Sequence, residues 1–268
     1  MNQPRQMDWP ESRISRLRRF TVLSPHLDDA ALSLGGTIAR AARAGAEVTV
    51  LTVLGGDPED RRPAGEWDRG CGFTSAGEAI RARRLEEARA CRRLRARGLQ
   101  LPFADDQYAG ARRDTEAWEA IEPLLAGAEA VLIPGWPLKH ADHRWVTRLA
   151  LGHLPGRTTV GLYVDQPYAV WETSGHPDLK RMTRRALEQA ARSRAAAQRQ
   201  IPGLVPGVQT AAREVSWQVV PLDAVAQMAK VRAVRAYESQ LRGFGRLFLT
   251  QIMLYAWADR GEPIGWLE

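Results

Sequence analysis

Short apolar runs alternate along the chain with longer segments in which apolar residues recur every three or four positions. The apolar runs predict strands at 20–23, 47–54, 99–103, 130–133, 158–164 and 214–222. The segments with helical spacing predict helices at 30–44, 75–97, 114–125, 144–153 and 224–237. Strands that alternate with helices, and that are apolar almost throughout, indicate a sheet buried on both faces. The pattern therefore predicts an α/β fold, a three-layer α/β/α sandwich with a mostly parallel sheet.

The organisation along the chain predicts one domain over residues 1–268, because neither an internal repeat nor a clear linker interrupts the alternation. Residues 1–19 form a polar, charged lead-in. Residues 165–215 form a predicted insertion near the mouth of the site, and they contain a very basic helical segment at 177–199. The loop at 55–72 is long for a connection between a strand and a helix, which makes it either mobile or functional.

Histidine and aspartate residues cluster at two places where a predicted strand gives way to a helix. Pro-His-Leu-Asp-Asp occupies residues 25–29 after the first strand, and His-Ala-Asp-His occupies residues 140–143 after the fourth. In an open parallel sheet the carboxyl ends of the strands lie at the edge where ligands bind. Because the two segments share that position, we expect them to form one divalent metal site.

The donor types suit zinc, which binds imidazole nitrogen and carboxylate oxygen and keeps an open position in catalytic sites. His26 and Asp29 are three residues apart across a turn, so both can bind one ion. A third ligand would come from His143 or His140. That choice leaves Asp28 and one histidine for proton transfer and for stabilising an oxyanion. The alternative for the aspartates is a helix cap, since caps are common at such junctions.

These two segments resemble the signature motifs of the PIG-L-like (LmbE-like) N-acetylglucosaminyl deacetylases, which are zinc hydrolases with a Rossmann-like α/β fold. The first family motif is His-Pro-Asp-Asp-Glu, and residues 26–30 differ from it only at Leu27 and Ala30. The second motif is His-x-Asp-His, which residues 140–143 match. Neither departure affects a ligand or base of the family, so the resemblance implies intact chemistry and leaves the substrate open.

Two further stretches extend the resemblance from about residue 20 to residue 240. Arg83 and Glu86 match an Arg-x-x-Glu helix that follows the second strand in the family. Near the end of the chain a Lys-(x)n-(Tyr/His)-x-Ser-Gln segment of the family is matched by Lys230, Tyr237, Ser239 and Gln240.

The resemblance implies a role for each motif residue. The zinc ligands would be His26, Asp29 and His143. Asp28 would be the general base, and His140 would polarise the carbonyl group or protonate the leaving amine. Asp142 would orient a neighbouring histidine. The predicted substrate-binding residues are Arg83, Glu86, Asp105 and Asp106. Zn²⁺ is the expected cofactor, although the same donors accept Fe²⁺ and other divalent transition metals.

We therefore expect a metal-dependent hydrolase that removes an N-acyl group, most readily N-acetyl, from a small molecule containing an amino sugar. Asp28 would act as base toward a water on the metal. One alternative is an amidase of the same mechanism that acts on a non-sugar or thiol-conjugate amide. Another is a dinucleotide-binding oxidoreductase, which the sequence disfavours because no Gly-x-Gly-x-x-Gly precedes the first helix.

Charge and composition limit the classes of molecule that we expect the protein to bind. The net charge is +7 with an isoelectric point near 10.0, but lysine occurs only at 139, 180 and 230, and the arginines are interleaved with Ala, Leu and Glu. Such interleaving predicts solvated helix faces, so we expect no nucleic acid partner.

No apolar stretch is long enough to span a membrane, and the first residues lack a signal-peptide core. Two cysteines cannot make a disulfide framework, which favours a cytoplasmic protein. The sequence is compatible with a homo-oligomer.

Overall fold

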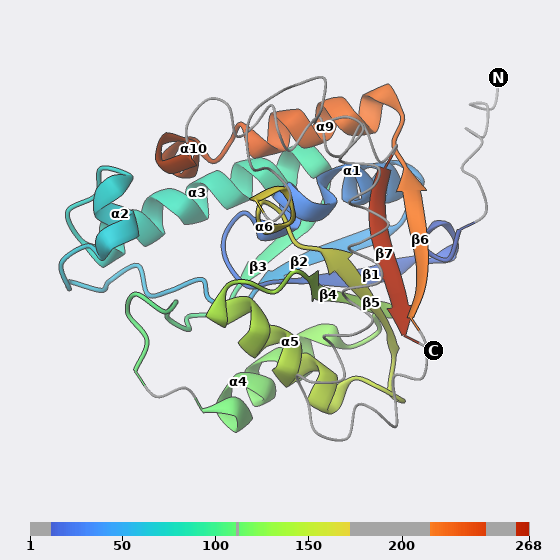
Figure 1. The fold of residues 1–268 in the computed structure, drawn as a ribbon, viewed down its shortest axis with the longest axis horizontal. Helices are drawn as coiled ribbons and strands as arrows, with labels where there is room; N and C mark the ends of the chain where they lie inside the picture. Colours follow the sequence, from blue (N-terminus) through green and yellow to red (C-terminus); the bar gives the residue numbers. More distant parts are fainter. Residues whose placement is uncertain (1–11, 111–112, 172–214, 245–260, 268) are drawn as a thin grey trace.

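One seven-stranded sheet organises the protein (Figure 1). The structure is a computed structural model, and it describes residues 12–110, 113–171, 215–244 and 261–267. The strand order is β3-β2-β1-β4-β5-β7-β6. The strands are β1 (Arg19–Ser24), β2 (Glu47–Thr52), β3 (Arg97–Gln100), β4 (Ala130–Trp136), β5 (Thr159–Val164), β6 (Val215–Pro221) and β7 (Gly261–Leu267).

Strands β1 to β5 run parallel to their neighbours, whereas β7 is antiparallel to both β5 and β6. The chain builds outward from β1 to β2 and β3 on one side, and then returns to place β4 and β5 on the other. The order therefore reverses between β1 and β4, and in such sheets ligands bind outside the carboxyl ends of the strands at that reversal. Both histidine-aspartate segments follow these two adjacent strands.

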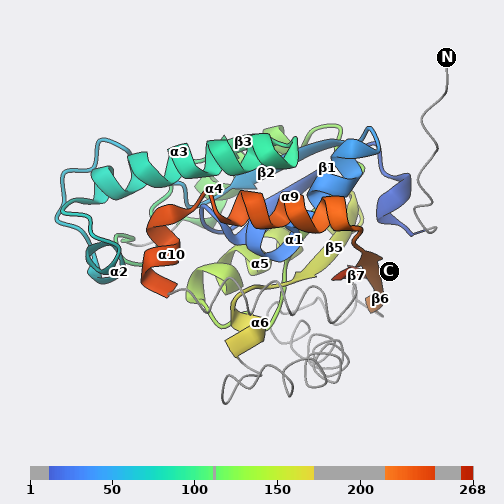
Figure 2. The same ribbon diagram turned by 90° about the horizontal axis from the view of Figure 1, so that it is seen from above.

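Helices cover both faces of the sheet (Figures 1 and 2). Helices α1, α3 and α9 lie on one face and pack against one another, while α4 and α5 lie on the other. The α-helices are α1 (Asp29–Arg43), α2 (Glu66–Gly70), α3 (Ala76–Leu94), α4 (Asp114–Ile121), α5 (Ala141–His153), α6 (Tyr168–Trp171), α9 (Ala224–Val234) and α10 (Glu238–Phe244). Two 3₁₀ helices are η1 (Ile14–Arg16) and η2 (Glu122–Leu125). Every helix in the described part of the chain is too short or too polar to cross a lipid bilayer.

The continuous apolar character of the central strands follows from burial on both faces. In β4, Val131 and Ile133 belong to the core beneath α4 and α5. Ala130 and Leu132 point the other way, into the core beneath α1, α3 and α9. Because successive side chains of a strand alternate between faces, a strand covered on both sides needs apolar residues at every position.

Helix α1 packs closely against the C-terminal part of the chain at a glycine. A Cβ atom on Gly36 would lie 2.4 Å from Cδ1 of Leu222, so a larger residue there would force the Leu222 side chain to move. The backbone N–H groups of Gly36 and Thr37 donate to Glu262 at 3.1 and 2.6 Å. Lys230 completes this buried group through an ion pair of 2.5 Å between its Nζ and Oε1 of Glu262.

The three-layer, mostly parallel architecture predicted from the sequence is confirmed, and most element bounds agree within a few residues. The third strand was placed two residues too late. Helix α3 ends at Leu94, the capping residue Arg95 adopts a left-handed conformation with φ 59°, and β3 then begins at Arg97. The predicted lead-in also contributes to the core, since Ile14 is 1% exposed. The basic segment 177–199 lies outside the described residues.

Helices α2, α6 and α10 and strand β7 were not predicted. Gly261–Leu267 contains two glycines and a proline and lacks strand-like alternation. Its pairing with β5 on one side and β6 on the other makes it a strand, so long-range contacts decide its conformation.

Candidate metal centre

The loop between β1 and α1 is held in shape by its own hydrogen bonds. Ser24 Oγ donates to the backbone oxygen of His26 at 2.7 Å and accepts from the N–H of Ala30 at 3.1 Å. The Asp29 carboxylate accepts from the backbone N–H of His26 through Oδ2 at 2.8 Å. Asp29 is the first residue of α1, where a carboxylate also interacts favourably with the helix dipole. The loop therefore presents Asp29 and His26 together.

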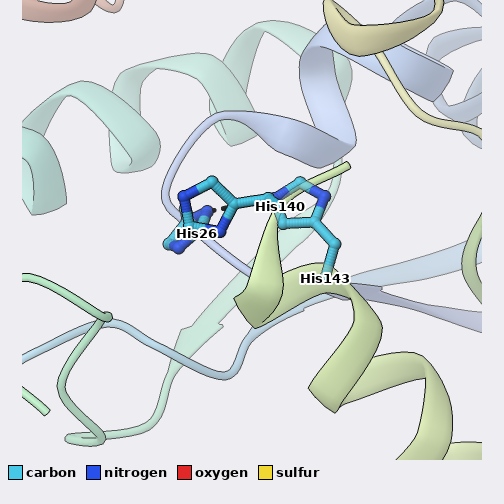
Figure 3. Close-up of side chains that lie close together, drawn as sticks. All are labelled: His26, His140 and His143. Atoms are coloured by element: carbon cyan, nitrogen blue, oxygen red, sulfur yellow. Dashed lines mark hydrogen bonds between the residues drawn. The ribbon is translucent and has the colours of Figure 1, made fainter. Parts of the chain in front are cut away.

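The second segment begins α5. His140 caps this helix, because its Nδ1 accepts a hydrogen bond from the backbone N–H of Asp142 at 3.2 Å. His143 lies in the first turn and its side chain is fully buried. Figure 3 shows the rings of His26, His140 and His143 gathered between the loop after β1 and the start of α5. The sheet order thus brings together residues more than one hundred positions apart.

Three donor atoms of the site form a nearly equilateral triangle. The distance from His26 Nδ1 to His143 Nε2 is 3.1 Å. Asp29 Oδ2 lies 3.3 Å from His26 Nδ1 and 3.2 Å from His143 Nε2. A tetrahedral ion with bonds of about 2.0–2.1 Å spaces its donors about 3.3 Å apart. The three residues therefore fit a single divalent transition metal.

In both His26 and His143, the ring nitrogen that faces away from the triangle contacts a buried carboxylate. His26 Nε2 lies 2.8 Å from Asp142 Oδ2. His143 Nδ1 lies 2.6 Å from Asp165 Oδ2. Carboxylates in this position accept the ring N–H and fix the tautomer, so that the opposite nitrogen is free to bind a metal. The arrangement is typical of histidine ligands.

The protonation equilibria agree with a site for a cation. Burial lowers the pKa of His143, but Asp165 and Asp29 outweigh it and raise the pKa to about 9. Burial likewise lowers the pKa of His26, but its contacts with Asp142 and Asp29 outweigh burial and raise the pKa. The pKa of Asp29 is held well below its usual range, because contacts with both histidines outweigh its burial. Without a metal the carboxylates retain protons on the rings, and a metal ion would displace them.

Asp28 is placed next to a candidate ligand and is 8% exposed. Burial, together with the charge of Asp29, raises its pKa well above that of a free carboxyl group, and the positive charges of His26 and Arg83 oppose the change. A buried carboxylate with a raised pKa is a stronger base than one in water. This environment suits the general-base role predicted for Asp28.

His140 lies beside the other two rings, with its ring centre 4.9 Å from that of His26 and 5.3 Å from that of His143. Burial and the neighbouring imidazoles lower its pKa. Because Nδ1 accepts the capping hydrogen bond, the proton of the neutral ring lies on Nε2. Nε2 is 3.6 Å from Asp106 Oδ2. His140 therefore offers an N–H donor at the site.

The four predicted substrate-binding residues are placed differently from one another. Arg83 forms a buried ion pair with Asp68 of α2, and its side chain is 8% exposed. Glu86 accepts from both the N–H and the hydroxyl of Ser239, at 2.9 and 2.7 Å. Arg83 and Glu86 do not form an ion pair with each other at the surface, because both residues are buried and have these other partners. Contacts within the chain occupy them, which counts against a direct contact with substrate.

Asp105 and Asp106 follow β3 and diverge. Asp105 is buried and accepts from the backbone N–H of Gln107 at 3.2 Å. Burial raises its pKa. The Asp106 side chain is half exposed beside His140, and its backbone N–H donates to Asp142 Oδ2 at 3.0 Å. Asp106 is therefore the best placed of the four for contact with a ligand.

Sequence reasoning missed Asp165 and Asp68. Asp165 directly follows the apolar strand β5, so the rule that identified the two motifs would also have found it. Tyr168 packs edge-on against the ring of His143, with ring centres 5.2 Å apart. Asp68 falls in the segment 55–72 that was expected to be a loop, whereas the structure places it in α2, and no local pattern indicates its pairing with Arg83.

The fold and the site together define a doubly wound α/β protein whose histidine and aspartate donors converge where the strand order reverses. Residues 21–153 match the protein family described as PIG-L, GlcNAc-PI de-N-acetylase. This match to the PIG-L family covers just under half of the chain. The matched residues include both histidine-aspartate segments and the strands that position them.

A relative with a known activity also matches the chain. The 2'-N-acetylparomamine deacetylase of Streptomyces fradiae is 35% identical over 176 residues. The match covers 58% of this chain and 60% of the relative, so it spans less than two thirds of the relative's length.

Solved structures share the fold. A deacetylase of the teicoplanin biosynthesis pathway superposes with a TM-score of 0.70 and 22% identity, over 92% of this chain and 97% of that one. Another structure of a teicoplanin deacetylase is described as its zinc-inhibited form. The A40926 pseudoaglycone deacetylase gives a TM-score of 0.68 with 24% identity, over 93% of this chain and 96% of that one.

Proposed function

We propose that the chain is a metal-dependent hydrolase that removes an acyl group, N-acetyl in the first instance, from the nitrogen of a small molecule containing an amino sugar. The observation that carries this proposal is the triangle of His26 Nδ1, Asp29 Oδ2 and His143 Nε2, with distances of 3.1 to 3.3 Å. Asp28 and His140 lie beside the triangle and remain available for proton transfer.

His26, Asp29 and His143 would hold the metal. When bound, a divalent ion there supplies a Lewis acid that lowers the pKa of water and polarises a carbonyl group. Two nitrogen donors and one carboxylate suit zinc, and they also accept Fe²⁺, Co²⁺ and Ni²⁺. Zinc is our first choice.

Asp28 would take the proton from the attacking water. Its burial raises the pKa of the carboxyl group toward the working pH, where a base transfers protons most effectively. His140 would donate from Nε2 to the carbonyl oxygen as negative charge develops on it. The proton taken up by Asp28 would then pass to the nitrogen of the leaving amine as the C–N bond breaks, which returns Asp28 to the carboxylate form, while His140 keeps its own proton.

An amino-sugar substrate is supported by the family and by the relative that is named as a 2'-N-acetylparomamine deacetylase. The half-exposed carboxylate of Asp106 is well placed to accept a hydrogen bond from a sugar hydroxyl, because it lies 3.6 Å from His140. The same residues could also hydrolyse an N-acyl amide that carries no sugar, which is the second candidate.

Release of acetate from a panel of substrates tests the proposal. The panel pairs N-acetylated amino glycosides with simple N-acetylated amines. Each is assayed with the protein as purified, after chelation, and after one equivalent of Zn²⁺ is returned. A single equivalent is used because one solved teicoplanin deacetylase is described as a zinc-inhibited form.

We expect release from glycosides that is lost on chelation and restored by zinc. Equal release from simple amines would favour the non-sugar amidase. Undiminished release from protein shown by elemental analysis to be metal-free would refute the proposal.

A further inference from the structure

Asp165 occupies a rigid position at the end of β5. Its backbone N–H donates to the oxygen of Trp136 at 2.6 Å, and its backbone oxygen accepts from the N–H of Ala169 at 2.9 Å. The side chain is fully buried, as is that of His143. Its Oδ2 lies 2.6 Å from His143 Nδ1. Backbone hydrogen bonds thus hold Asp165 in place, and its short, buried side chain leaves the carboxylate little freedom to move.

The geometry separates Asp165 from the candidate ligands. His26 Nδ1 and Asp29 Oδ2 approach Nε2 of His143 at 3.1 and 3.2 Å. Asp165 contacts Nδ1, the nitrogen on the other side of the same ring. An ion held at Nε2 would therefore lie across the imidazole ring from this contact, although possible ligand atoms of Asp29, His143 and Asp165 also lie within 4.8 Å of one another.

We propose that Asp165 is a positioning residue that keeps the proton of His143 on Nδ1 and turns Nε2 toward the metal. The inference rests on the metal site of the proposed function. The ionised carboxylate also makes the imidazole a stronger donor, as carboxylates do behind metal-bound histidines. Asp142 has the equivalent place behind His26, but it also accepts from the N–H of Asp106.

Three variants separate this role from a general effect on folding. Asp165→Ala removes both the hydrogen bond and the charge. Asp165→Asn retains an oxygen that accepts from Nδ1–H but lacks the charge. Tyr163→Phe is the matched control, because the Tyr163 hydroxyl is buried on the same strand but donates to the backbone oxygen of Leu23 at 3.0 Å and not to His143.

Metal affinity is measured by competition with a chromophoric chelator, and the visible spectrum of the Co²⁺-loaded protein reports on the geometry of the ligands. We expect Asp165→Ala to weaken metal binding about 10- to 100-fold and to change the Co²⁺ spectrum. Asp165→Asn should fall between this variant and the wild type. Tyr163→Phe should keep the wild-type affinity and spectrum. At saturating metal, kcat should fall in the Asp165 variants while KM stays constant.

Wild-type affinity and an unchanged Co²⁺ spectrum in both Asp165 variants would overturn the inference. Equal weakening by Tyr163→Phe would also overturn it, since the effect would then be structural. Neither readout needs a substrate. Metal binding that depends on Asp165 in a protein without deacetylase activity would support the inference and count against the proposed function.

Discussion

Two buried polar clusters of this protein contain residues that resemble family motifs, and they differ in how their polar atoms are paired. The first is the candidate metal centre at the reversal of strand order. The second, which we call the helix-layer network, joins α2, α3, α10 and the turn before α10 through Asp68, Arg83, Glu86, Glu87, Tyr237 and Ser239.

In the helix-layer network each acid meets a donor from another element. Arg83 is paired with Asp68, and Tyr237 donates to Glu87. In the metal centre, two ring nitrogens and a carboxylate oxygen converge within 3.3 Å of one another. Such atoms need a shared cation or additional protons between them. Matching donors to acceptors therefore separates a cluster that can hold a ligand from one that holds the fold together.

The largest effect should come from removing a ligand. We expect His26→Ala to lose stoichiometric metal and to lower kcat/KM by about 10³-fold or more, because a bound metal contributes several kcal/mol to transition-state stabilisation. Elemental analysis and acetate release measure the two effects together. His153→Ala is the matched control, because His153 stacks on Trp118 away from the site. If His26→Ala retained stoichiometric metal, His26 would not be a metal ligand, and this cluster would not be the metal site.

Asp28→Asn should separate the base from the ligands. The amide keeps the shape of the side chain but accepts a proton poorly, so kcat should fall by about 10²–10⁴-fold with metal content near that of the wild type. The exposed Asp57→Asn variant serves as the control. Full activity of Asp28→Asn on the true substrate would exclude Asp28 as the base.

Arg83→Ala tests the helix-layer network. Removing one partner of a buried ion pair leaves Asp68 without its charge partner, so the free energy of unfolding should fall by about 3–5 kcal/mol. Denaturant titration measures this, with the exposed Arg89→Ala on the same helix as control. A variant of unchanged stability whose kcat/KM fell tenfold would instead assign Arg83 to substrate binding.

Glu87→Gln should show a smaller effect that depends on pH. Burial raises the pKa of Glu87 from 4.5 to about 7, which corresponds to about 3 kcal/mol. The folded state therefore binds this proton more tightly than the unfolded state, and wild-type stability falls as the pH rises from about 4.5 to 7. Glutamine remains neutral, so the variant should gain stability relative to the wild type across that interval.

Denaturant titrations of both metal-loaded proteins at several pH values check this prediction. Glu78→Gln on the exposed face of α3 should show no such gain, because hydrogen bonds from Thr74 lower the pKa of Glu78. A difference between Glu87→Gln and the wild type that does not vary with pH would contradict the prediction.

The sequence alone determined the features that depend on neighbouring residues. Spacing of apolar residues is local, so it placed the parallel strands and most helices. The histidine-aspartate segments were found because ligands three residues apart, at a junction between strand and helix, leave a readable pattern. Helix caps such as Ser75, which accepts from the N–H of Glu78, are encoded equally close to where they act.

Tertiary structure decided which distant residues meet. No local pattern pairs Asp165 with His143 or Arg83 with Asp68, because these contacts depend on the order of strands and the packing of helices. Residues 261–267 become a strand only between β5 and β6. Local patterns encode which conformation a segment prefers, whereas partners for buried charges and for strand edges exist only after the chain has folded.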